Sequence, residues 1–398
     1  MSLIVPLDQQ PQSENKHRPD VIFTFSFETW VDALERELGR PPDRFVEWLE
    51  TVAEVNQIIV ADPFRSLPVR IAKQVLRRPE RPSRPLARGV LSGPHRFVHR
   101  EYRSPAALTR SYARYEAQLQ DTARGAGMGA PRVITVHPII AGFCEFSWAE
   151  SVTYWALDDW AVHPDYEAER PAIKAAYERI RARSVPVASV SQVLVDRVGS
   201  ANSVLVPNAV DGREFEHPWP APTWFVSPSG PRVVYQGSID RRLDAQALGS
   251  IADAIGTGTL FLVGPIIDRT HLDAVTSRPN VVLTDNLSRS DLLGVLGAAD
   301  LGVVPHAVTS LTEAMSPLKL YEYLASGCPV VATDLAPMRN VSRRVRLVNN
   351  PLCWGEETRR GIALGRATDA ERSAFVANNN WNRRFESLLF GSNPLVGQ

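Results

Sequence analysis

Several features that would assign a protein to a particular compartment or chemistry are scarce in this sequence. Its 398 residues include only three cysteines, Cys144, Cys328 and Cys353, which form no CxxC pair and have no histidine at ligand spacing. A disulfide-rich secreted domain and a cysteine-based metal site are therefore excluded, and we expect three reduced core residues in a cytosolic protein. No other constellation of metal ligands is visible, so we expect no essential metal and no other cofactor.

Long apolar runs and net charge are also lacking. No apolar run approaches the ~18–20 residues of a membrane-spanning helix, and residues 1–20 lack the charged and then apolar pattern of a signal peptide. The 44 Lys and Arg residues balance the 44 Asp and Glu residues, so no global charge favours nucleic acid as a partner. We expect a cytoplasmic protein that is soluble or peripheral on the inner face of the cell membrane.

An alternation of strand and helix patterns runs along almost the whole chain. Short apolar runs alternate with helical patterns, as in parallel sheets whose strands are buried on both faces. The strand-like runs are 21–26, 56–61, 132–137, 152–159 and 185–191 in the first half, and 232–236, 260–263, 281–283, 301–304 and 330–332 in the second. The stretch between the two series, Phe215 to Pro231, is rich in Pro and Trp and reads as a linker.

This pattern predicts an α/β protein with two doubly wound, Rossmann-like domains that face each other across a cleft. The segments expected are a flexible leader at 1–20, a first domain at 21–212, a linker at 213–231, a second domain at 232–368 and a helix at 369–398 that packs back on the first domain. One sheet could then hold a nucleotide and the other an acceptor.

One segment, Phe64 to Arg103, is strongly basic. Within it, Val69 to Arg78 places apolar residues on one helical face and Arg70, Lys73 and Arg77 on another, which is typical of a helix lying on an anionic lipid surface. A solvated and partly irregular insertion would show the same composition. Replacing these cations with Gln should weaken vesicle binding, more so at low salt, if the first interpretation holds.

The most informative stretch runs from Ser316 to Asp334. It reads as an amphipathic helix that opens at Pro317, ends at Gly327 and enters a buried strand. Proline has no N–H of its own, so the N–H groups of Ser316, Leu318 and Lys319 would stand free at the helix start. Such an end attracts phosphate.

Two side chains of this helix point to a nucleotide. Lys319 and Glu322 are three residues apart and share one helical face, so the ammonium could meet phosphate while the carboxylate accepts hydrogen bonds from ribose hydroxyls. A surface salt bridge between the two would give the same spacing.

Further candidates lie at the ends of expected strands. Gly237 follows a strand and lets the backbone approach a diphosphate, which Arg241 and Arg242 could neutralise; a plain turn with solvated arginines is the alternative. In the first domain, polar residues follow strands at the edge where α/β proteins bind ligands. The candidates there for orienting or deprotonating an acceptor are His137, Asp158 and Asp159.

Five motifs in order over residues 204–334 resemble nucleotide-sugar glycosyltransferases of the retaining GT-B type, family 1/4-like, and in detail those that assemble bacterial surface polysaccharides. The motifs are Val206-Pro207-Asn208-Ala209-Val210-Asp211, Tyr235-Gln236-Gly237-Ser238, Leu262-Val263-Gly264-Pro265, Ala299-Asp300-Leu301-Gly302-Val303-Val304-Pro305 and Ser316 to Asp334. The first half matches in layout more than in residues.

The resemblance implies a hexosyltransferase-type enzyme that moves a sugar from a nucleoside-diphosphate donor to a glycan or lipid-linked acceptor with retention. It further implies front-face attack without a protein nucleophile, in which the departing phosphate takes the proton. The donor residues implied are Gly237, Ser238, Arg241, Arg242, Gly264, Ser316, Pro317, Leu318, Lys319 and Glu322.

The sequence departs from the family at three points. Many members carry a Glu eight residues before the position of Glu322, where this chain has Ala314, with Glu313 one residue off register. Ser238 stands where many carry Arg, and Asp244 stands near the place of a common Lys. Two alternatives follow: a nucleotide-sugar epimerase of the same fold, and a non-catalytic partner protein that binds nucleotide or glycan.

Overall fold

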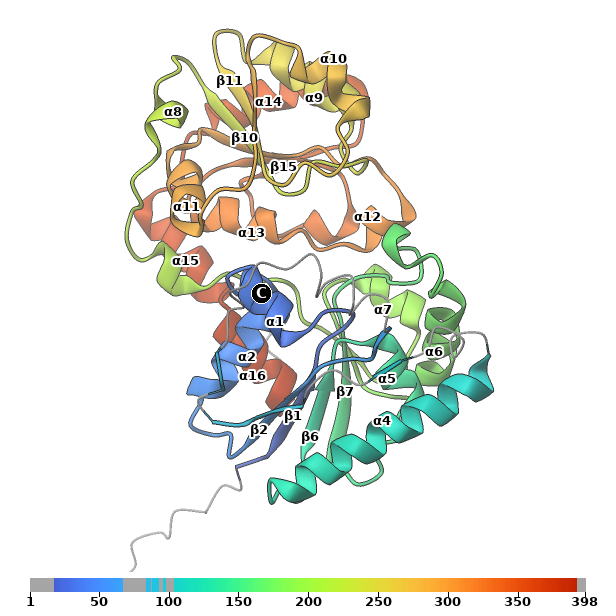
Figure 1. Cartoon of the computed structure of the whole chain (residues 1–398). Helices are drawn as coiled ribbons and strands as arrows, with labels where there is room; N and C mark the ends of the chain where they lie inside the picture. The colour runs from blue at the N-terminus through green and yellow to red at the C-terminus, as the bar shows by residue number, and fades with distance from the viewer. Residues whose placement is uncertain (1–17, 67–83, 87, 93–95, 98–103, 392–398) are drawn as a thin grey trace, which may run out of the picture.

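The computed structural model describes residues 18–66, 84–86, 88–92, 96–97 and 104–391. Two halves are stacked end to end, each built on its own parallel β-sheet with helices on both faces (Figure 1). The expectation of an α/β protein with two Rossmann-like domains is confirmed.

The first sheet has seven parallel strands in the order β4-β2-β1-β6-β7-β8-β9. Their bounds are β1 (Val21–Thr24), β2 (Ile58–Ala61), β4 (Val90–Ser92), β6 (Arg132–Thr135), β7 (Ser151–Ala156), β8 (Val187–Ser189) and β9 (Ser203–Leu205). All four residues of β1 and of β2 are buried, as expected for central strands covered on both faces. A separate parallel pair joins β3 (Arg65–Ser66) to β5 (Arg96–Phe97).

Alternate residues of β1 enter two different cores. Ile22 packs in a cluster with residues of α4, α5 and α6, whereas Val21 and Phe23 pack with residues of α1, α2 and α16. The helices of this half are α1 (Trp30–Glu35), α2 (Pro41–Thr51), α4 (Pro105–Gly125), α5 (Pro138–Phe143), η2 (Pro164–Tyr166), α6 (Arg170–Ala182) and α7 (Gln192–Val198). The first half is therefore a three-layer sandwich.

The second sheet has six parallel strands in the order β12-β11-β10-β13-β14-β15. Their bounds are β10 (Arg232–Gln236), β11 (Thr259–Val263), β12 (Val281–Thr284), β13 (Leu301–Val304), β14 (Val330–Thr333) and β15 (Val345–Val348). The helices are α9 (Ala245–Ala254), η4 (Thr270–Leu272), α10 (Asp273–Thr276), α11 (Arg289–Ala298), α12 (Ser310–Ala314), α13 (Leu318–Ala325), η5 (Ala336–Met338), η6 (Pro351–Cys353) and α14 (Trp354–Ala363). Short helices η3 (Gly212–Phe215) and α8 (Thr223–Val226) lie in the expected linker.

The last part of the chain returns to the first half. The segment expected as one helix is two, α15 (Asp369–Asn378) and α16 (Trp381–Phe390), because the Asn380 side chain caps α16 and the Asn379 carbonyl accepts the amide of Val210 at 2.9 Å. α16 lies beside α2 (Figure 1), where the ring of Phe385 is 5.2 Å from that of Phe45.

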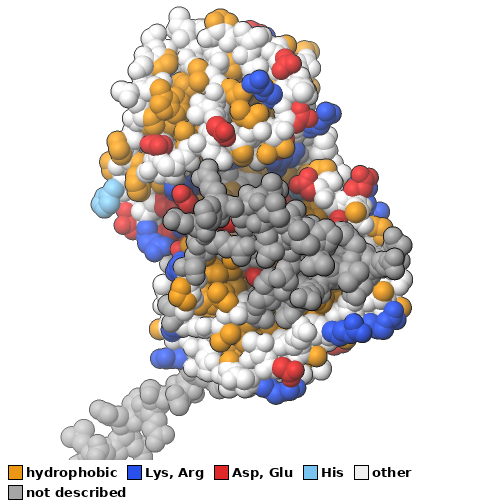
Figure 2. All heavy atoms as spheres, in the orientation of Figure 1, with side chains coloured by type: hydrophobic (Ala, Val, Ile, Leu, Met, Phe, Trp, Pro, Cys, Tyr) orange, Lys and Arg blue, Asp and Glu red, His pale blue; other side chains and the backbone are white. Residues whose placement is uncertain are grey.

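Within the described ranges, no helix combines the length and the apolar character needed to cross a membrane. On the face shown in Figure 2, acidic and basic side chains both occur over the described part of the surface. The basic stretch containing Arg70, Lys73, Arg77 and Arg78 lies outside the described residues.

Two described cations that follow that stretch, Arg84 and Arg88, contact the protein itself. Arg84 pairs with Glu50 at 2.9 Å, and the guanidinium of Arg88 donates to the carbonyl oxygens of Leu49 at 3.1 Å and Val52 at 2.6 Å. These arginines therefore anchor their segment to α2. Among the cysteines, Cys144 and Cys328 are buried and Cys353 is partly exposed, all as free thiols.

Candidate functional site

Helix α13 belongs to the second half and runs along its edge that faces the first half (Figure 1). It begins at Leu318, so Pro317 is the N-cap residue and not the first helical residue. The amides of Leu318 and Lys319 have no acceptor among the described residues, as expected for a helix start. The carbonyl of the buried Ser316 accepts the side-chain amide of Asn208 at 2.5 Å, which ties the helix start to the first half.

Lys319 is held by Tyr235 and requires Gly237. Its Nζ donates to the Tyr235 hydroxyl at 2.8 Å and lies 4.1 Å from the centre of that ring. Gly237 has φ +129°, and a Cβ there would lie 2.7 Å from Nζ. Burial, followed by the charge of Arg242, lowers the pKa of Lys319 to about 7. The site therefore holds an ammonium that a bound anion would stabilise.

The loop after β10 brings a second cation to this place. The Arg242 guanidinium pairs with Asp240 at 2.6 Å, and although burial opposes it, the carboxylate raises the pKa of Arg242. His306, which follows β13, is buried with Nε2 3.5 Å from Lys319 Nζ. Burial and the two cations lower the pKa of His306 well below its usual value, so the ring is neutral.

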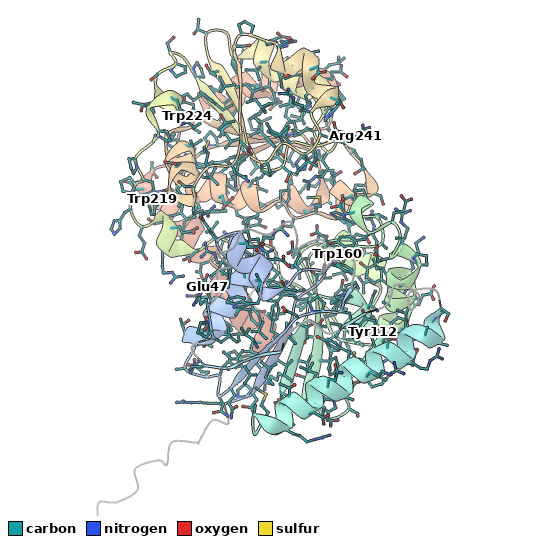
Figure 3. The ribbon with its side chains drawn as sticks, viewed as in Figure 1. Glu47, Tyr112, Trp160, Trp219, Trp224 and Arg241 are labelled. Atoms are coloured by element: carbon teal, nitrogen blue, oxygen red, sulfur yellow. The ribbon has the colours of Figure 1, made fainter. Side chains whose placement is uncertain are left out.

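The other residues expected in this loop have different positions. The Tyr235 hydroxyl donates to the main-chain oxygen of Ser238 at 2.9 Å. Gly264 has φ +140°, and a Cβ there would lie 2.4 Å from the carbonyl oxygen of Gly237, so it allows the two loops to meet. Arg241 points outward (Figure 3), is 80% exposed and pairs with Asp268 at 2.6 Å. The structure thus brings Arg242 to Lys319 and leaves Arg241 on the surface.

Glu322 is the end of a chain of charges that joins the two halves. It is 3% exposed, and its two oxygens accept from Gln236 Nε2 at 2.7 Å and Arg289 Nη1 at 2.6 Å. Arg289 also pairs with Glu214 at 2.5 Å, and Glu214 accepts from Arg44 of α2 at 2.6 Å. Glu322 is not paired with Lys319, so the alternative of a simple salt bridge between them is wrong.

The three candidates of the first half have different environments. Asp159 is buried and pairs with Arg197 at 3.0 Å, while its other oxygen accepts the amide of Ala161. His137 caps α5 through Nδ1, which accepts the amide of Ile139 at 3.2 Å, and burial lowers its pKa to about 3. Both have structural partners.

Asp158, in contrast, is half-buried, and its carboxylate has no hydrogen-bond partner among the described residues. Burial raises its pKa to about 6, although Arg242 and Arg40 counteract the rise. Arg242 belongs to the second half, so Asp158, at the end of β7, is under the influence of a charge from across the boundary. Asp158 is therefore the first-half candidate whose carboxylate is available to a ligand.

Ala314 explains one departure from the family pattern. It is fully buried against the first half, and its carbonyl oxygen accepts the Ser191 hydroxyl at 2.7 Å. A glutamate there would place a carboxylate inside this contact. Glu313 is instead exposed and lies 3.5 Å from Arg197.

Sequence reasoning missed Asp240, Arg289 and His306. His306 follows the apolar strand β13, and a polar residue at a strand end was the available signal. Arg289 gave no signal, since it is one arginine at a helix start. Within the described ranges, no group of three or more His, Cys, Asp and Glu side chains could hold a metal ion, and metal independence stays a prediction.

Comparisons with known proteins agree with this layout. Residues 230–353 match the family model "Glycosyl transferases group 1". The Bacillus subtilis (strain 168) protein named "Putative teichuronic acid biosynthesis glycosyltransferase TuaH" is 29% identical over 208 residues, which are 48% of this chain and 52% of that protein. The chain thus spans about half the length of this curated relative.

Two solved structures show the same fold. The Escherichia coli trehalose-6-phosphate structure bound with UDP-2-fluoro glucose has a TM-score of 0.63 at 10% identity, over 95% of this chain and 99% of that chain. Anabaena HepE in complex with UDP and glucose has a TM-score of 0.57 at 12% identity, over 94% and 95%.

Proposed function

We propose that this chain, which has the GT-B fold and a match to the group 1 glycosyltransferase model in its second half, transfers a sugar in cell-envelope polysaccharide or glycolipid synthesis. The donor is a nucleoside-diphosphate sugar and the acceptor is a glycan or a lipid-linked saccharide. The anomeric configuration is retained.

The observation that carries the proposal is the group formed by Lys319, Gly237 and the free amides at the start of α13. A half-buried ammonium and unpaired N–H groups are suited to a diphosphate, which they bind by charge-assisted hydrogen bonds. Arg242 adds a second cation near Lys319. These groups stabilise the negative charge that grows on the diphosphate as the bond to the sugar breaks.

Glu322 accepts hydrogen bonds from the ribose hydroxyl groups of the donor. Each carboxylate oxygen has two lone pairs, so hydroxyl groups can bind in addition to Gln236 and Arg289. The UDP held by HepE and the UDP-sugar analogue held by the E. coli structure make UDP-sugars the first donors to test.

In the first half, Asp158 orients the acceptor hydroxyl. The attacking oxygen enters on the face from which the diphosphate leaves, and that phosphate takes the proton, so no protein nucleophile is needed. Asp158 approaches Arg242 from the opposite half and can hold the hydroxyl in this position. No step requires a metal, and we expect a chelator to leave turnover essentially unchanged.

The test is product analysis with UDP-, GDP- and dTDP-sugars, each with and without a lipid-linked acceptor from a cell-envelope extract. The proposal predicts acceptor-dependent release of nucleoside diphosphate and a glycoside with the anomeric configuration of the donor. An isomerised donor formed without acceptor would indicate an epimerase instead. Tight donor binding without transfer to any acceptor would indicate a non-catalytic partner protein.

Localisation at the inner face of the membrane is part of the same proposal. The basic segment 64–103 would meet anionic lipid or an acceptor diphosphate. Unchanged vesicle binding after substitution of Arg70, Lys73, Arg77 and Arg78 by Gln would contradict this part alone.

A further inference from the structure

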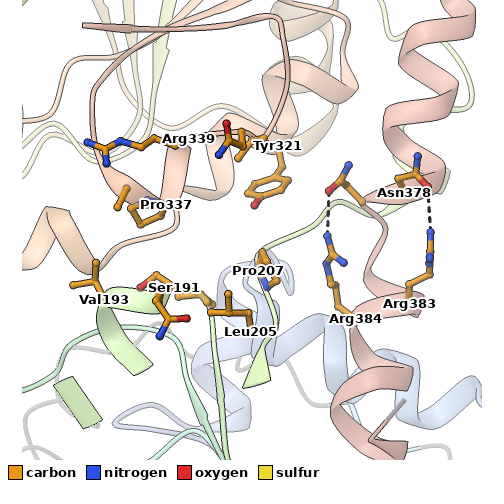
Figure 4. A pocket seen from close by; sticks show the side chains of 16 residues that line it. Ser191, Val193, Leu205, Pro207, Tyr321, Pro337, Arg339, Asn378, Arg383 and Arg384 are labelled. Carbon is orange, nitrogen blue, oxygen red and sulfur yellow. Dashed lines mark hydrogen bonds between the residues drawn. The ribbon is translucent and has the colours of Figure 1, made fainter. Parts of the chain in front are cut away.

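A cavity of about 370 Å³ lies between the two halves on the other side of α13 from Lys319. Its walls come from the segments that follow β8 and β9, from Tyr321 of α13, from the loop around η5 and from the junction of α15 and α16 (Figure 4). Tyr321 is two residues from Lys319, which is about 200° around a helix. None of the residues proposed to bind donor lines this cavity.

A buried arginine without a counter-charge forms one wall. Arg384 is 4% exposed, its Nη2 donates to the Asn379 side chain at 3.1 Å, and its buried Nε has no partner in the described part of the chain. Burial lowers the pKa of Arg384, which is the opposite of what a carboxylate partner would do. Because a buried unpaired charge is costly, this guanidinium is suited to an anion that the protein itself does not provide.

Two further arginines line the same cavity. Arg383 donates to the Asn378 side chain at 3.2 Å and, like Arg384, has no carboxylate partner among the residues described. Arg339 lies on the opposite wall and pairs with Asp334 at 2.7 Å (Figure 4). The charge inside is therefore strongly positive, although the chain as a whole has equal numbers of basic and acidic residues.

The other residues that line the cavity are of the types that bind sugars. Side-chain amides of Gln192, Asn340 and Asn378 can exchange hydrogen bonds with hydroxyl groups, and Pro207, Pro337 and Tyr321 offer apolar surfaces for the C–H faces of a ring. The volume falls within the usual range of small-molecule sites.

We propose that this cavity binds an acidic sugar unit, carrying a carboxylate or a phosphate group, at a site separate from the donor site. The anionic group lies against Arg384 and Arg383, and the hydroxyl groups meet the amides. Because both halves contribute walls, an occupant would also hold them in the arrangement described. The proposal does not depend on sugar transfer, since binding is measured without turnover.

The experiment is calorimetric titration of the full chain with D-glucuronate, glucose 6-phosphate, inorganic phosphate and neutral glucose. We expect one or both acidic sugars to bind at least tenfold more tightly than glucose and than phosphate, and their ranking identifies the anionic group. Equal affinity for all four probes, or no binding of either acidic sugar, would overturn the proposal. Phosphate as tight as glucose 6-phosphate would overturn the sugar part.

Substitutions of the cavity arginines test whether the acidic sugar binds in this cavity. Arg384→Met and Arg383→Gln are each expected to weaken acidic-sugar binding at least tenfold, while the exposed Arg359→Gln on α14, with the same loss of charge, changes nothing. Unfolding of the ligand-free protein is the second readout: a structural Arg384 would lower Tm when replaced, whereas an unpaired one would not. Wild-type binding by both cavity variants, or displacement of the acidic sugar by saturating UDP, would contradict a separate site.

Discussion

Gly237 determines where the ammonium of Lys319 lies. Its positive φ disfavours any other residue, and a Cβ would lie only 2.7 Å from Nζ, so a side chain there would have to displace Lys319. The sequence could indicate Gly237, Lys319 and Glu322, because a glycine after a strand and a proline-opened helix have direct backbone consequences. It could not rank Asp158 against Asp159 or Arg241 against Arg242, because neighbouring residues of one type differ only in what they contact after folding.

Gly237→Ala tests this close approach. We expect donor affinity to fall at least tenfold, because the methyl group displaces Lys319. Backbone strain should also lower the free energy of unfolding by about 1–3 kcal/mol. Gly256→Ala is the matched control, since Gly256 also has positive φ (+59°) but has open space around its Cβ position. Equal loss of UDP affinity in both variants, measured by calorimetry, would show that strain alone is responsible.

The adjacent acids of the first half should respond differently to pH and to substitution. Burial raises the pKa of the Asp158 carboxyl to about 6, so kcat/KM should rise with pH through that value. It should fall again above about pH 7, where free Lys319 loses the proton that the diphosphate needs. Asp158→Asn should remove this rise and lower kcat/KM by ~10²-fold or more.

Asp159→Asn is the control for that experiment. It should keep the pH dependence and instead destabilise the protein by about 1–3 kcal/mol, because Arg197 loses its buried carboxylate partner. A pH profile unchanged in Asp158→Asn would rule out the assigned role.

At the scale of elements, α11, α13 and the linker are held together by alternating charges. Glu214 lies between Arg44 of α2 and Arg289 of α11, and Arg289 reaches Glu322 of α13. Strong periodicity predicted α13 and the strands around it well. It missed α5 and α12, because six-residue and five-residue helices are too short to show a period.

Arg289→Met should leave Glu322 and Glu214 buried without their shared partner. We expect the protein to lose about 3 kcal/mol of unfolding free energy and UDP affinity to fall. The double variant Arg289→Met with Glu214→Gln should regain part of the stability in a denaturation experiment. Simple additivity of the two single changes would mean that the network carries no coupling.

At the scale of the whole molecule, α16 fastens the end of the second half to the first. Its inner face buries Trp381, Phe385, Leu388 and Leu389 in the core that contains α2. The sequence predicted this return, because a late apolar face needs a core to cover it. The break at Asn379 and Asn380 could not be predicted, since it depends on the distant Val210.

Phe385→Ala measures this attachment. We expect a loss of about 3–5 kcal/mol in unfolding free energy, because the ring is 1% exposed and contacts Phe45, Trp48 and Trp155. Phe390→Ala on the same helix is the control, and it should cost less than ~1 kcal/mol because that ring is 38% exposed. Similar losses in urea titrations of the two variants would contradict the role of α16.

The central claim is that a diphosphate binds at Lys319 and the start of α13. Titration calorimetry with UDP at pH 7.5, in two buffers of different ionisation enthalpy, tests it most directly. Because burial lowers the pKa of Lys319 to about 7, an arriving diphosphate should raise it again, so the wild type takes up protons on binding. Lys319→Met should lose this uptake and bind UDP at least ~100-fold more weakly, about 2.7 kcal/mol. Unchanged affinity and unchanged proton uptake in Lys319→Met would contradict the account.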